Sequence, residues 1–428
     1  MVSGAAAALP DAFLADLDER LAAADDALVR QYPGDAGTRQ PVHTAYVPAD
    51  RFTPTTAADW GRAALAALDA HGADPATLAE ATGLQPEVVT DVLDRVRGKL
   101  AREPIEDLRI DFEDGYRERP DQPEDAAAEM AAGALASAVR DGGAPAFVGI
   151  RLKSLERPTR RRGLRTLAMF TSRLHDELAG EFPAGFVLTL PKVTSVDQVA
   201  AMVGVCEQLE STIGLVPGTL RFEIQVETPQ AVLGPDGAAT VARMVHAAQA
   251  RCSGLHYGTY DYSAALGVSA AFQSMEHPVA DHAKAVMQVA AASTGIRLSD
   301  GSTNVVPDGD RSAVHAAWRL HARLVRRSLE RGYYQGWDMH PAQLPTRYLA
   351  TYAFFRAGLP VAVDRLRAYL SQGQSGVLDE PATAQALAGF VVRGLDCGAV
   401  DPAEVTGLGG PDRTVLDRLA RRLTPTPP

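Results

Sequence analysis

Short apolar runs along the chain alternate with longer stretches that have the spacing of amphipathic helices. Eight of these runs have strand character, and helical segments separate them. Because parallel strands need crossover helices and a closed barrel leaves no free sheet edge, the pattern predicts an α/β fold of the (β/α)8 TIM barrel type. The predicted strands cover residues 43–47, 107–112, 146–152, 185–190, 222–226, 255–261, 296–298 and 333–339.

Other segments flank or interrupt this alternation. Residues 12–30 place leucines on one side of a predicted outer helix, and residues 73–103 form a helical insert after the first strand and helix. Helical patterns also continue beyond the last strand. The predicted parts are an N-terminal helical segment (1–41), a catalytic barrel domain that includes the insert (42–355) and a C-terminal helical lid or extension (356–428).

The composition is that of a globular protein, with 46% hydrophobic and 22% charged residues among 428. A net charge of −11 argues against a nucleic acid or an anionic membrane as the partner. Residues 78–89 of the insert resemble a helix-turn-helix. Their acidic side chains favour a packed helical hairpin over a DNA-binding element.

The cysteines and the first residues of the chain indicate where in the cell the protein is expected. Cys206, Cys252 and Cys397 lie far apart, and no CxxC spacing suggests a disulfide framework or a zinc site. The first residues lack the basic start and long apolar core of a signal peptide, and no run approaches the roughly 18 apolar residues of a membrane span. We therefore expect a cytoplasmic protein without a membrane partner.

Polar side chains collect at the carboxyl ends of the predicted strands. In a barrel these ends surround one mouth, which is where barrel enzymes place their chemistry. A purely structural protein has no reason to gather acids, a guanidinium and an imidazole there, so the pattern favours an enzyme. The residues are Asp111, Glu113, Asp114, Arg151, Lys192, Glu227, Asp261 and His340.

Glu227 and Asp261 end two successive predicted strands, with a helical segment between them. Two carboxylates at one mouth are typical of a site for a hard divalent cation such as Mg2+, which takes oxygen ligands and keeps several waters. The alternative is that both residues cap the helices that follow, because Asp and Glu favour helix N-termini. The metal prediction therefore depends on the other strand ends.

Seven short motifs follow the order of the strands: YVPADR, IDFEDGYR, GIRLK, LPKV, IQVETPQAV, GTYDYSAALG and MHPAQL. In this order they resemble the HpcH/HpaI aldolase and citrate lyase β-subunit superfamily, which also contains malyl-CoA lyases and is related to malate synthases. The resemblance extends from about residue 42 to residue 385, with the helical insert outside it.

The resemblance implies an activity. We expect a Mg2+-dependent carbon–carbon lyase or aldolase that makes or cleaves a bond next to a carbonyl through a metal-stabilised enolate. A 2-oxo acid of the glyoxylate, pyruvate or oxaloacetate type would be its product or substrate. The resemblance also makes Glu227 and Asp261 the metal ligands, with Mn2+ as an alternative ion, and a CoA thioester is a possible substrate.

Further roles are predicted for the remaining rim residues. Arg151 would present its fork of donors to a carboxylate or a developing enolate, or would pair with Asp111 nearby. Asp111, Glu113 and Asp114 would hold metal-bound waters rather than the ion itself.

Substrate contacts are also predicted for Lys192 and Asp261, with a rim ion pair as the alternative for Lys192. His340 would orient the substrate or move a proton, unless a hydrogen bond holds it below the rim.

Beyond the barrel, residues 375–392 resemble the C-terminal segment of CoA lyases, whose Asp serves as the acid/base in a lid that crosses between subunits. Asp379 matches that Asp. The resemblance therefore implies a catalytic Asp379 and a homo-oligomer. The alternative is that Asp379 and Glu380 precede an ordinary helix with Pro381 in its first turn.

Two departures from the superfamily's motifs leave open which of its subfamilies the chain resembles most. Asp114 stands where the pyruvate aldolases place a His, which favours the citrate-lyase and malyl-CoA-lyase side, whereas DYSAALG is closer to the aldolases. The competing functions are a CoA-independent class II pyruvate aldolase, a malate synthase-like condensing enzyme and a non-catalytic assembly subunit. Retention of Glu227, Asp261 and Arg151 argues against the last.

Overall fold

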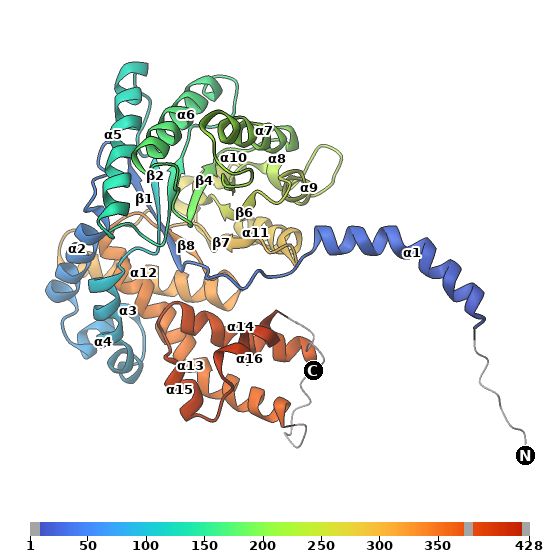
Figure 1. Ribbon diagram of the computed structural model, residues 1–428. Coiled ribbons are helices and arrows are strands. Elements are labelled where there is room, and N and C mark those ends of the chain that lie inside the picture. Colours follow the sequence, from blue (N-terminus) through green and yellow to red (C-terminus); the bar gives the residue numbers. More distant parts are fainter. Residues whose placement is uncertain (1–8, 372–379, 422–428) are drawn as a thin grey trace, which may run out of the picture.

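A computed structural model describes residues 9–371 and 380–421 of the chain. Eight parallel strands form one sheet in the order β7-β6-β5-β4-β3-β2-β1-β8 (Figure 1). The strands are β1 (His43–Pro48), β2 (Asp107–Asp111), β3 (Phe147–Arg151), β4 (Phe186–Leu190), β5 (Phe222–Val226), β6 (Cys252–Tyr257), β7 (Arg297–Ser299) and β8 (Gly336–Asp338). The predicted (β/α)8 barrel is confirmed.

The barrel is nearly closed. β1 pairs in parallel with both β2 and β8, and one isolated parallel bridge, between Ser299 and Gln335, joins the β7 side to the β8 side. β7 and β8 have three residues each, so the predicted eighth strand over residues 333–339 was too long. The predicted sixth strand was also misplaced, since β6 ends at Tyr257 and Asp261 lies in the helix that follows.

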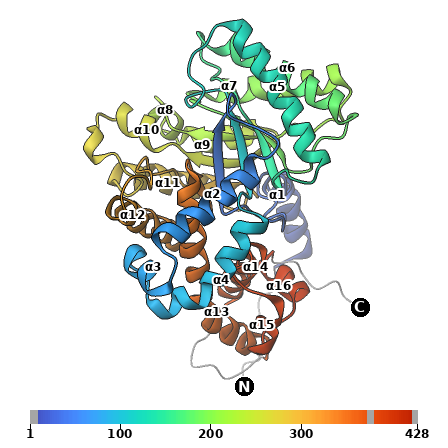
Figure 2. The ribbon, with the colours of Figure 1, turned by 90° about the vertical axis from the view of Figure 1, so that its left-hand side faces the viewer.

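Helices surround the sheet and extend beyond it (Figures 1 and 2). They are α1 (Asp11–Gln31), α2 (Thr56–His71), α3 (Pro75–Thr82), α4 (Pro86–Arg102), α5 (Asp121–Arg140), α6 (Arg160–Glu177), α7 (Val196–Ile213), α8 (Pro229–Val232), α9 (Thr240–Ala247), α10 (Thr259–Ala265), α11 (Pro278–Ala291), α12 (Arg311–Glu330), α13 (Leu344–Leu370), α14 (Pro381–Asp396), α15 (Pro402–Gly407) and α16 (Arg413–Ala420). Short 3-10 turns cover Ala270–Phe272 and Pro341–Gln343. None of the helices in the described ranges is long and apolar enough to cross a membrane.

The strands alternate between two environments. On β5, Phe222, Ile224 and Val226 are buried in the hydrophobic core, while Glu223 and Gln225 are buried polar residues at the alternate positions. Successive strand residues face opposite sides, so polar residues line the interior of the barrel. Polar residues are therefore not confined to the carboxyl ends of the strands.

The insert forms a packed helical hairpin. Asp74 caps α3 by accepting from the backbone N–H of Thr77, and Gly83 ends the helix in the left-handed conformation. α4 buries Val89, Val92 and four further side chains, and the hairpin contacts α12 and α13. The face that a DNA-reading helix would expose is used for packing.

The C-terminal helices form a layer beside the barrel. α13 contacts α12, α4 and α14, and α14 packs on α16 (Figures 1 and 2). Asp379, the predicted acid/base, lies outside the described residues.

Candidate functional site

The carboxyl ends of β2, β3 and β4 and the loops after them surround a cavity of about 430 Å3. Among the residues predicted for the mouth, Glu113, Asp114 and Lys192 line this cavity, so it lies on one side of that mouth. Its wall combines both signs of charge, and the lining residues are Glu113, Asp114, Arg117, Glu118, Arg119, Lys153, Ser154, Glu156, Pro158, Thr159, Arg162 and Lys192.

Arg151 ends β3 beside this cavity and is 5% exposed. Its Nε and Nη2 atoms donate to the two carboxylate oxygens of Asp111, at 2.7 and 2.8 Å. Asp111, at the end of β2, also accepts from the backbone N–H groups of Glu113 and Gly115. The ion pair that was the alternative for Arg151 is therefore present. It holds the guanidinium over the ring of Tyr46, with Nη1 3.4 Å from Glu113.

Lys192 follows β4 and points its ammonium into the acidic part of the rim. Nζ donates to Glu113 and lies 2.9 Å from Asp114 Oδ1 and 3.2 Å from Asp261 Oδ2. Burial opposes the charge, but Glu113 and the other carboxylates raise the pKa of Lys192 above its ordinary value. The amine therefore stays protonated and does not suit the role of a Schiff-base nucleophile.

Glu227 lies directly after β5 and is 4% exposed. Oε1 accepts from the backbone N–H of Lys192 at 2.7 Å. The other side of the carboxylate lies against Gly258, where an added Cβ would be 2.4 Å from the Cβ of Glu227 and 2.5 Å from Oε2. Burial raises the pKa of Glu227 to about 7; Lys192 opposes this shift, and Glu113 adds to it. The carboxylate therefore lacks full compensation for its negative charge.

Asp261 lies in the first turn of α10 rather than at the end of β6, and its side chain is 46% exposed. Its charge also contributes to the raised pKa of Glu227. Within the described ranges no group of three or more His, Cys, Asp or Glu side chains is placed to hold a metal ion. Mg2+ commonly takes only one or two protein carboxylates and keeps several waters, so two carboxylates with oxygen donors alone fit its chemistry.

His340 follows β8, with its imidazole turned toward its own backbone. Nδ1 accepts from the backbone N–H of Ala342 and caps the turn Pro341–Gln343. Burial lowers the pKa of His340. This hydrogen bond leaves the proton on Nε2, so a neutral His340 offers a donor there.

Sequence reasoning missed residues that shape the rim. The ammonium of Lys153 is buried, donates to the carbonyl oxygen of Phe112 at 2.7 Å and lies 3.3 Å from Glu124. It therefore fixes the start of the acidic loop. The signal was visible in GIRLK, where Lys153 follows Arg151 by two residues. For Gly258 the only signal was its place directly after β6, because its contact with Glu227 depends on the neighbouring strand.

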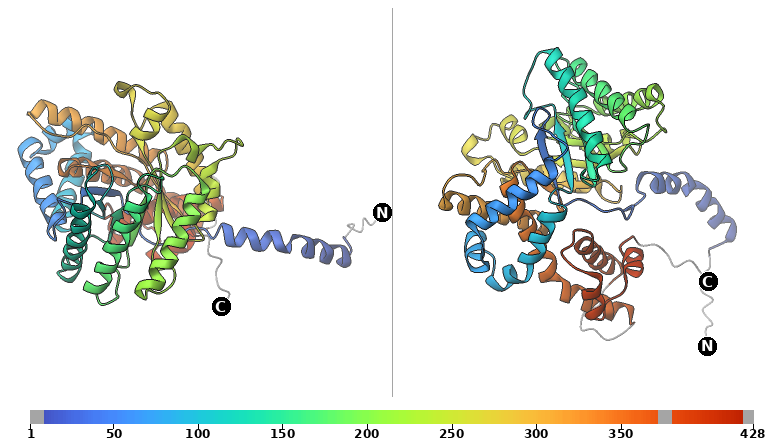
Figure 3. Two further views of the ribbon diagram at one scale, coloured as in Figure 1. Left: turned by 90° about the horizontal axis from the view of Figure 1, so that it is seen from above. Right: turned by 60° about the vertical axis from the view of Figure 1, so that its left-hand side comes forward.

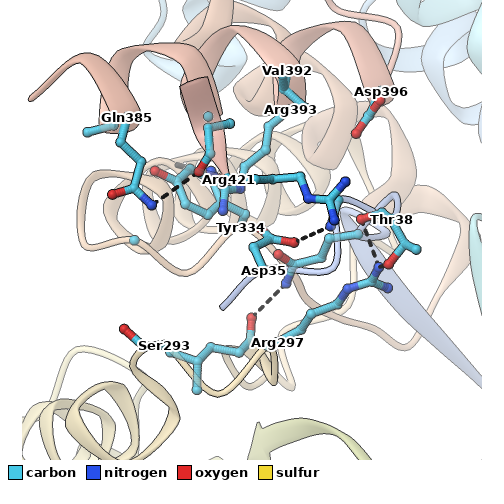
Figure 4. A pocket seen from close by; sticks show the side chains of 18 of the residues that line it. Asp35, Thr38, Ser293, Arg297, Tyr334, Gln385, Val392, Arg393, Asp396 and Arg421 are labelled. Carbon is cyan, nitrogen blue, oxygen red and sulfur yellow. Dashed lines mark hydrogen bonds between the residues drawn. The ribbon is translucent and has the colours of Figure 1, made fainter. Parts of the chain in front are cut away.

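A second cavity, of about 370 Å3, lies at the other end of the barrel (Figure 4). Residues 35–40, the starts of β7 and β8, and helices α14 and α16 surround it. Arg297 donates to Thr38 there, and Arg393 stacks over Tyr334. None of the predicted site residues in the described ranges lines this cavity, so the rim remains the candidate site.

Similar folds occur among solved structures. A citrate lyase from Burkholderia xenovorans LB400 matches at 20% identity and a TM-score of 0.59, over 87% of this chain and 97% of that one. CitE of Mycobacterium tuberculosis, in complex with magnesium, acetoacetate and coenzyme A, matches at 17% identity and a TM-score of 0.48, over 85% of this chain and 99% of that one. A malate synthase from Haloferax volcanii, as its lead(II) complex, matches at 15% identity and a TM-score of 0.47, over 86% and 89% of the two chains.

The first match establishes that the chain shares the fold of citrate lyase, as the motifs predicted; identity this low establishes the fold and not the activity. No curated protein matches the sequence. A family model does match, over residues 21–423, which is most of the chain. The chain therefore belongs to the family described as Domain of unknown function (DUF6986).

Proposed function

We propose that this protein is a Mg2+-dependent carbon–carbon lyase that cleaves or forms a bond next to a carbonyl, with a 2-oxo acid as one reactant or product. One observation carries the proposal. Glu227 is a buried carboxylate whose negative charge its neighbours do not fully balance. It lies on a rim that also carries other carboxylates and the guanidinium of Arg151, which Asp111 holds in place. The fold that the chain shares with a citrate lyase supports the same class of enzyme.

Glu227 and Asp261 would hold the ion, which supplies Lewis acidity at the carboxylate and carbonyl oxygens of a 2-oxo acid. In the cleavage direction the hydroxyl proton of the substrate passes to a base, and its carbon becomes the carbonyl of the 2-oxo acid. The electron pair of the broken bond leaves with the other fragment as an enolate, which then takes up a proton.

Arg151 would stabilise the charge that develops in this step. Asp111 fixes the guanidinium before the substrate arrives, so little reorganisation is needed. Lys192 would hold Glu113, Asp114 and Asp261 in place and partly balance their charge. His340 would orient the substrate by donating from Nε2, because its Nδ1 accepts from the backbone N–H of Ala342.

The metal assignment is tested by binding. The purified chain, stripped with a chelator, should bind one Mg2+ or Mn2+ per subunit, measured by calorimetry or by the Mn2+ resonance signal. Glu227→Gln should weaken binding by more than about 100-fold, since changes to residues that only support ligands already cost 10–100-fold. The matched control is Glu207→Gln on the exposed face of α7, which should bind as the parent does. Parent-like binding by Glu227→Gln would remove the assignment.

The reaction is tested with a panel of 2-oxo acids, each offered with and without acetyl-CoA or propionyl-CoA in the presence of Mg2+. Condensation products that require the thioester would place the enzyme with the CoA lyases or malate synthases. Products formed without CoA would place it with the pyruvate aldolases. An absence of any carbon–carbon bond formation or cleavage across the panel would contradict the proposal.

Asp379 stays the predicted acid/base, supplied by a neighbouring subunit. Mixing an Asp379→Ala protein with a Glu227→Ala protein, under conditions where subunits exchange, should restore part of the activity if sites are shared. A mixture as inactive as its parents would indicate a self-contained site. Full activity of Asp379→Ala alone would exclude the role.

A further inference from the structure

α1 stands apart from the rest of the molecule. It projects from the body as an arm (Figure 1 and the left view of Figure 3), and none of its 21 residues is buried. Several large apolar side chains on it are exposed, among them Leu14 at 40%, Leu21 at 47% and Leu28 at 60%. A soluble helix that exposes such a row of side chains commonly buries it against a partner.

The spacing of the row is that of a coiled coil. Leu14, Leu17, Leu21, Ala24 and Leu28 follow one another at intervals of 3, 4, 3 and 4 residues, which are the alternating a and d positions of a heptad repeat. The stripe has a period of 3.5, which suits a single facing helix. Phe13 flanks it at a g position, and Val29 lies outside it at a b position. A helix that packs on a globular surface commonly has a broader apolar face.

The charges beside the stripe identify which helix faces it. Arg20 occupies a g position on one side, and Asp18 and Asp25 occupy e positions on the other. In a parallel pair of identical helices, a g residue meets the e residue five positions later on the partner, which brings Arg20 against Asp25. In an antiparallel pair, e positions face e positions, so Asp18 would meet Asp25 as a like-charged pair.

We infer that α1 of one chain pairs in parallel with α1 of a second copy, forming a two-stranded coiled coil that joins two subunits. Arg20 and Asp25 are complementary to the same helix in the same direction, whereas the other g positions, Phe13 and Ala27, are uncharged. A second copy therefore satisfies the stripe and this flanking pair. Other occupants, such as the body of a second copy or a different protein, make no use of the Arg20–Asp25 pairing.

The first experiment measures the mass of the full chain in solution over a range of concentrations, by light scattering after size exclusion and by ultracentrifugation. The parent should dimerise, and Leu21→Asp should raise the dimer dissociation constant by about 100-fold or more, because each dimer loses two buried leucines. The matched control is Ala23→Asp, which adds the same charge on the opposite face of α1 and should dimerise like the parent. Since no residue of α1 is buried, circular dichroism and melting of the body should not change in either variant.

The second experiment tests direction. Leu14→Cys should form a disulfide-linked dimer under mild oxidation, because a parallel pair places the two Leu14 positions together. The native cysteines Cys206, Cys252 and Cys397 are buried, so the background is low. An antiparallel pair would instead link Leu14→Cys to Leu28→Cys in a mixture of the two proteins.

A charge exchange completes the test. Arg20→Asp alone should weaken the dimer, and Arg20→Asp with Asp25→Arg should restore it. A parent that is monomeric at all concentrations would overturn the inference. So would an assembly that Leu21→Asp leaves intact, or crosslinking only between Leu14→Cys and Leu28→Cys.

Discussion

Glu223 and Glu227 lie four residues apart at β5, face the same barrel interior and are both buried. Their surroundings differ. Glu223 accepts two hydrogen bonds from Arg109, at 3.0 and 2.8 Å, and one from Thr189 at 2.5 Å, and its Oε2 lies 3.0 Å from Nε2 of His256. Burial alone would raise its pKa, but Arg109 and His256 bring the pKa of Glu223 well below the ordinary value. At Glu227, burial prevails and the pKa rises to about 7.

This difference in pKa makes Glu223 a structural charge and Glu227 a candidate functional one. Inside the barrel, each oxygen of Glu223 has partners that the fold itself supplies, so the ionised form stabilises the native state. At the rim, Glu227 has one backbone N–H and the more distant Lys192, and neighbouring carboxylates oppose its ionisation. A carboxylate held ionised at such a place is suited to an external cation.

The largest effect is expected below the rim. The buried guanidinium of Arg109 pairs with two carboxylates, those of Asp107 and Glu223. Glu223→Gln removes one of these charges, and breaking a buried ion pair in this way typically costs about 3–5 kcal/mol of stability. Denaturant unfolding should show this loss, while Mg2+ binding at temperatures where the variant is folded should remain. A variant as stable as the parent would mean that Asp107 alone can balance Arg109.

At the rim the expected loss is in rate rather than in stability. Arg151→Lys keeps the charge but cannot reproduce the paired donation to Asp111, so the donor facing the substrate is no longer fixed. We expect kcat to fall by about 10²–10³, the usual cost of one preorganised donor. The control is Arg119→Lys, in the wall of the 430 Å3 cavity beside Arg151, and it should keep most of the activity. Equal rates in the two variants would make the Arg151 ion pair purely structural.

The pH dependence of stability should distinguish the two glutamates. The pKa of Glu227 is raised from 4.5 to about 7 in the folded chain, so in metal-free protein its ionisation is a penalty. The penalty is absent below about pH 4.5, grows up to about pH 7 and then reaches about 3 kcal/mol. Glu227→Gln removes it, so the variant should gain stability over the parent between about pH 5 and pH 8, measured by unfolding with a chelator present. A difference that does not change with pH would contradict the raised pKa.

The smallest effect tests the contact behind Glu227. Gly258 has a φ of −98°, which any residue adopts, so Gly258→Ala acts only through the crowding of its Cβ against the carboxylate. We expect Mg2+ affinity to fall by about 10–100-fold, as for other residues that position a ligand. Gly133→Ala on α5, where a Cβ meets open space, should leave affinity unchanged.

The sequence determined the number and order of the strands, because alternation of apolar and polar residues and crossover helices are local patterns. It also identified which residues reach the carboxyl-end rim, since a residue directly after a parallel strand has only one place to go. Arg151, Lys192 and Glu227 were located in this way. The polar residues inside the barrel were equally visible in DLRID and FEIQVE, where Asp107, Arg109 and Glu223 alternate with apolar residues, but the contact between Arg109 and Glu223 joins two strands that are distant in the sequence.

Only the tertiary structure decided how these charges are compensated. Arg151 meets Asp111 from 40 residues away, and Arg109 meets Glu223 from 114 residues away. Burial and partners together set each pKa, and neither is a property of a local segment. The sequence could therefore place two glutamates on one side of β5. The neighbouring strands gave Glu223 the cationic partners that lower its pKa and left Glu227 with a raised pKa.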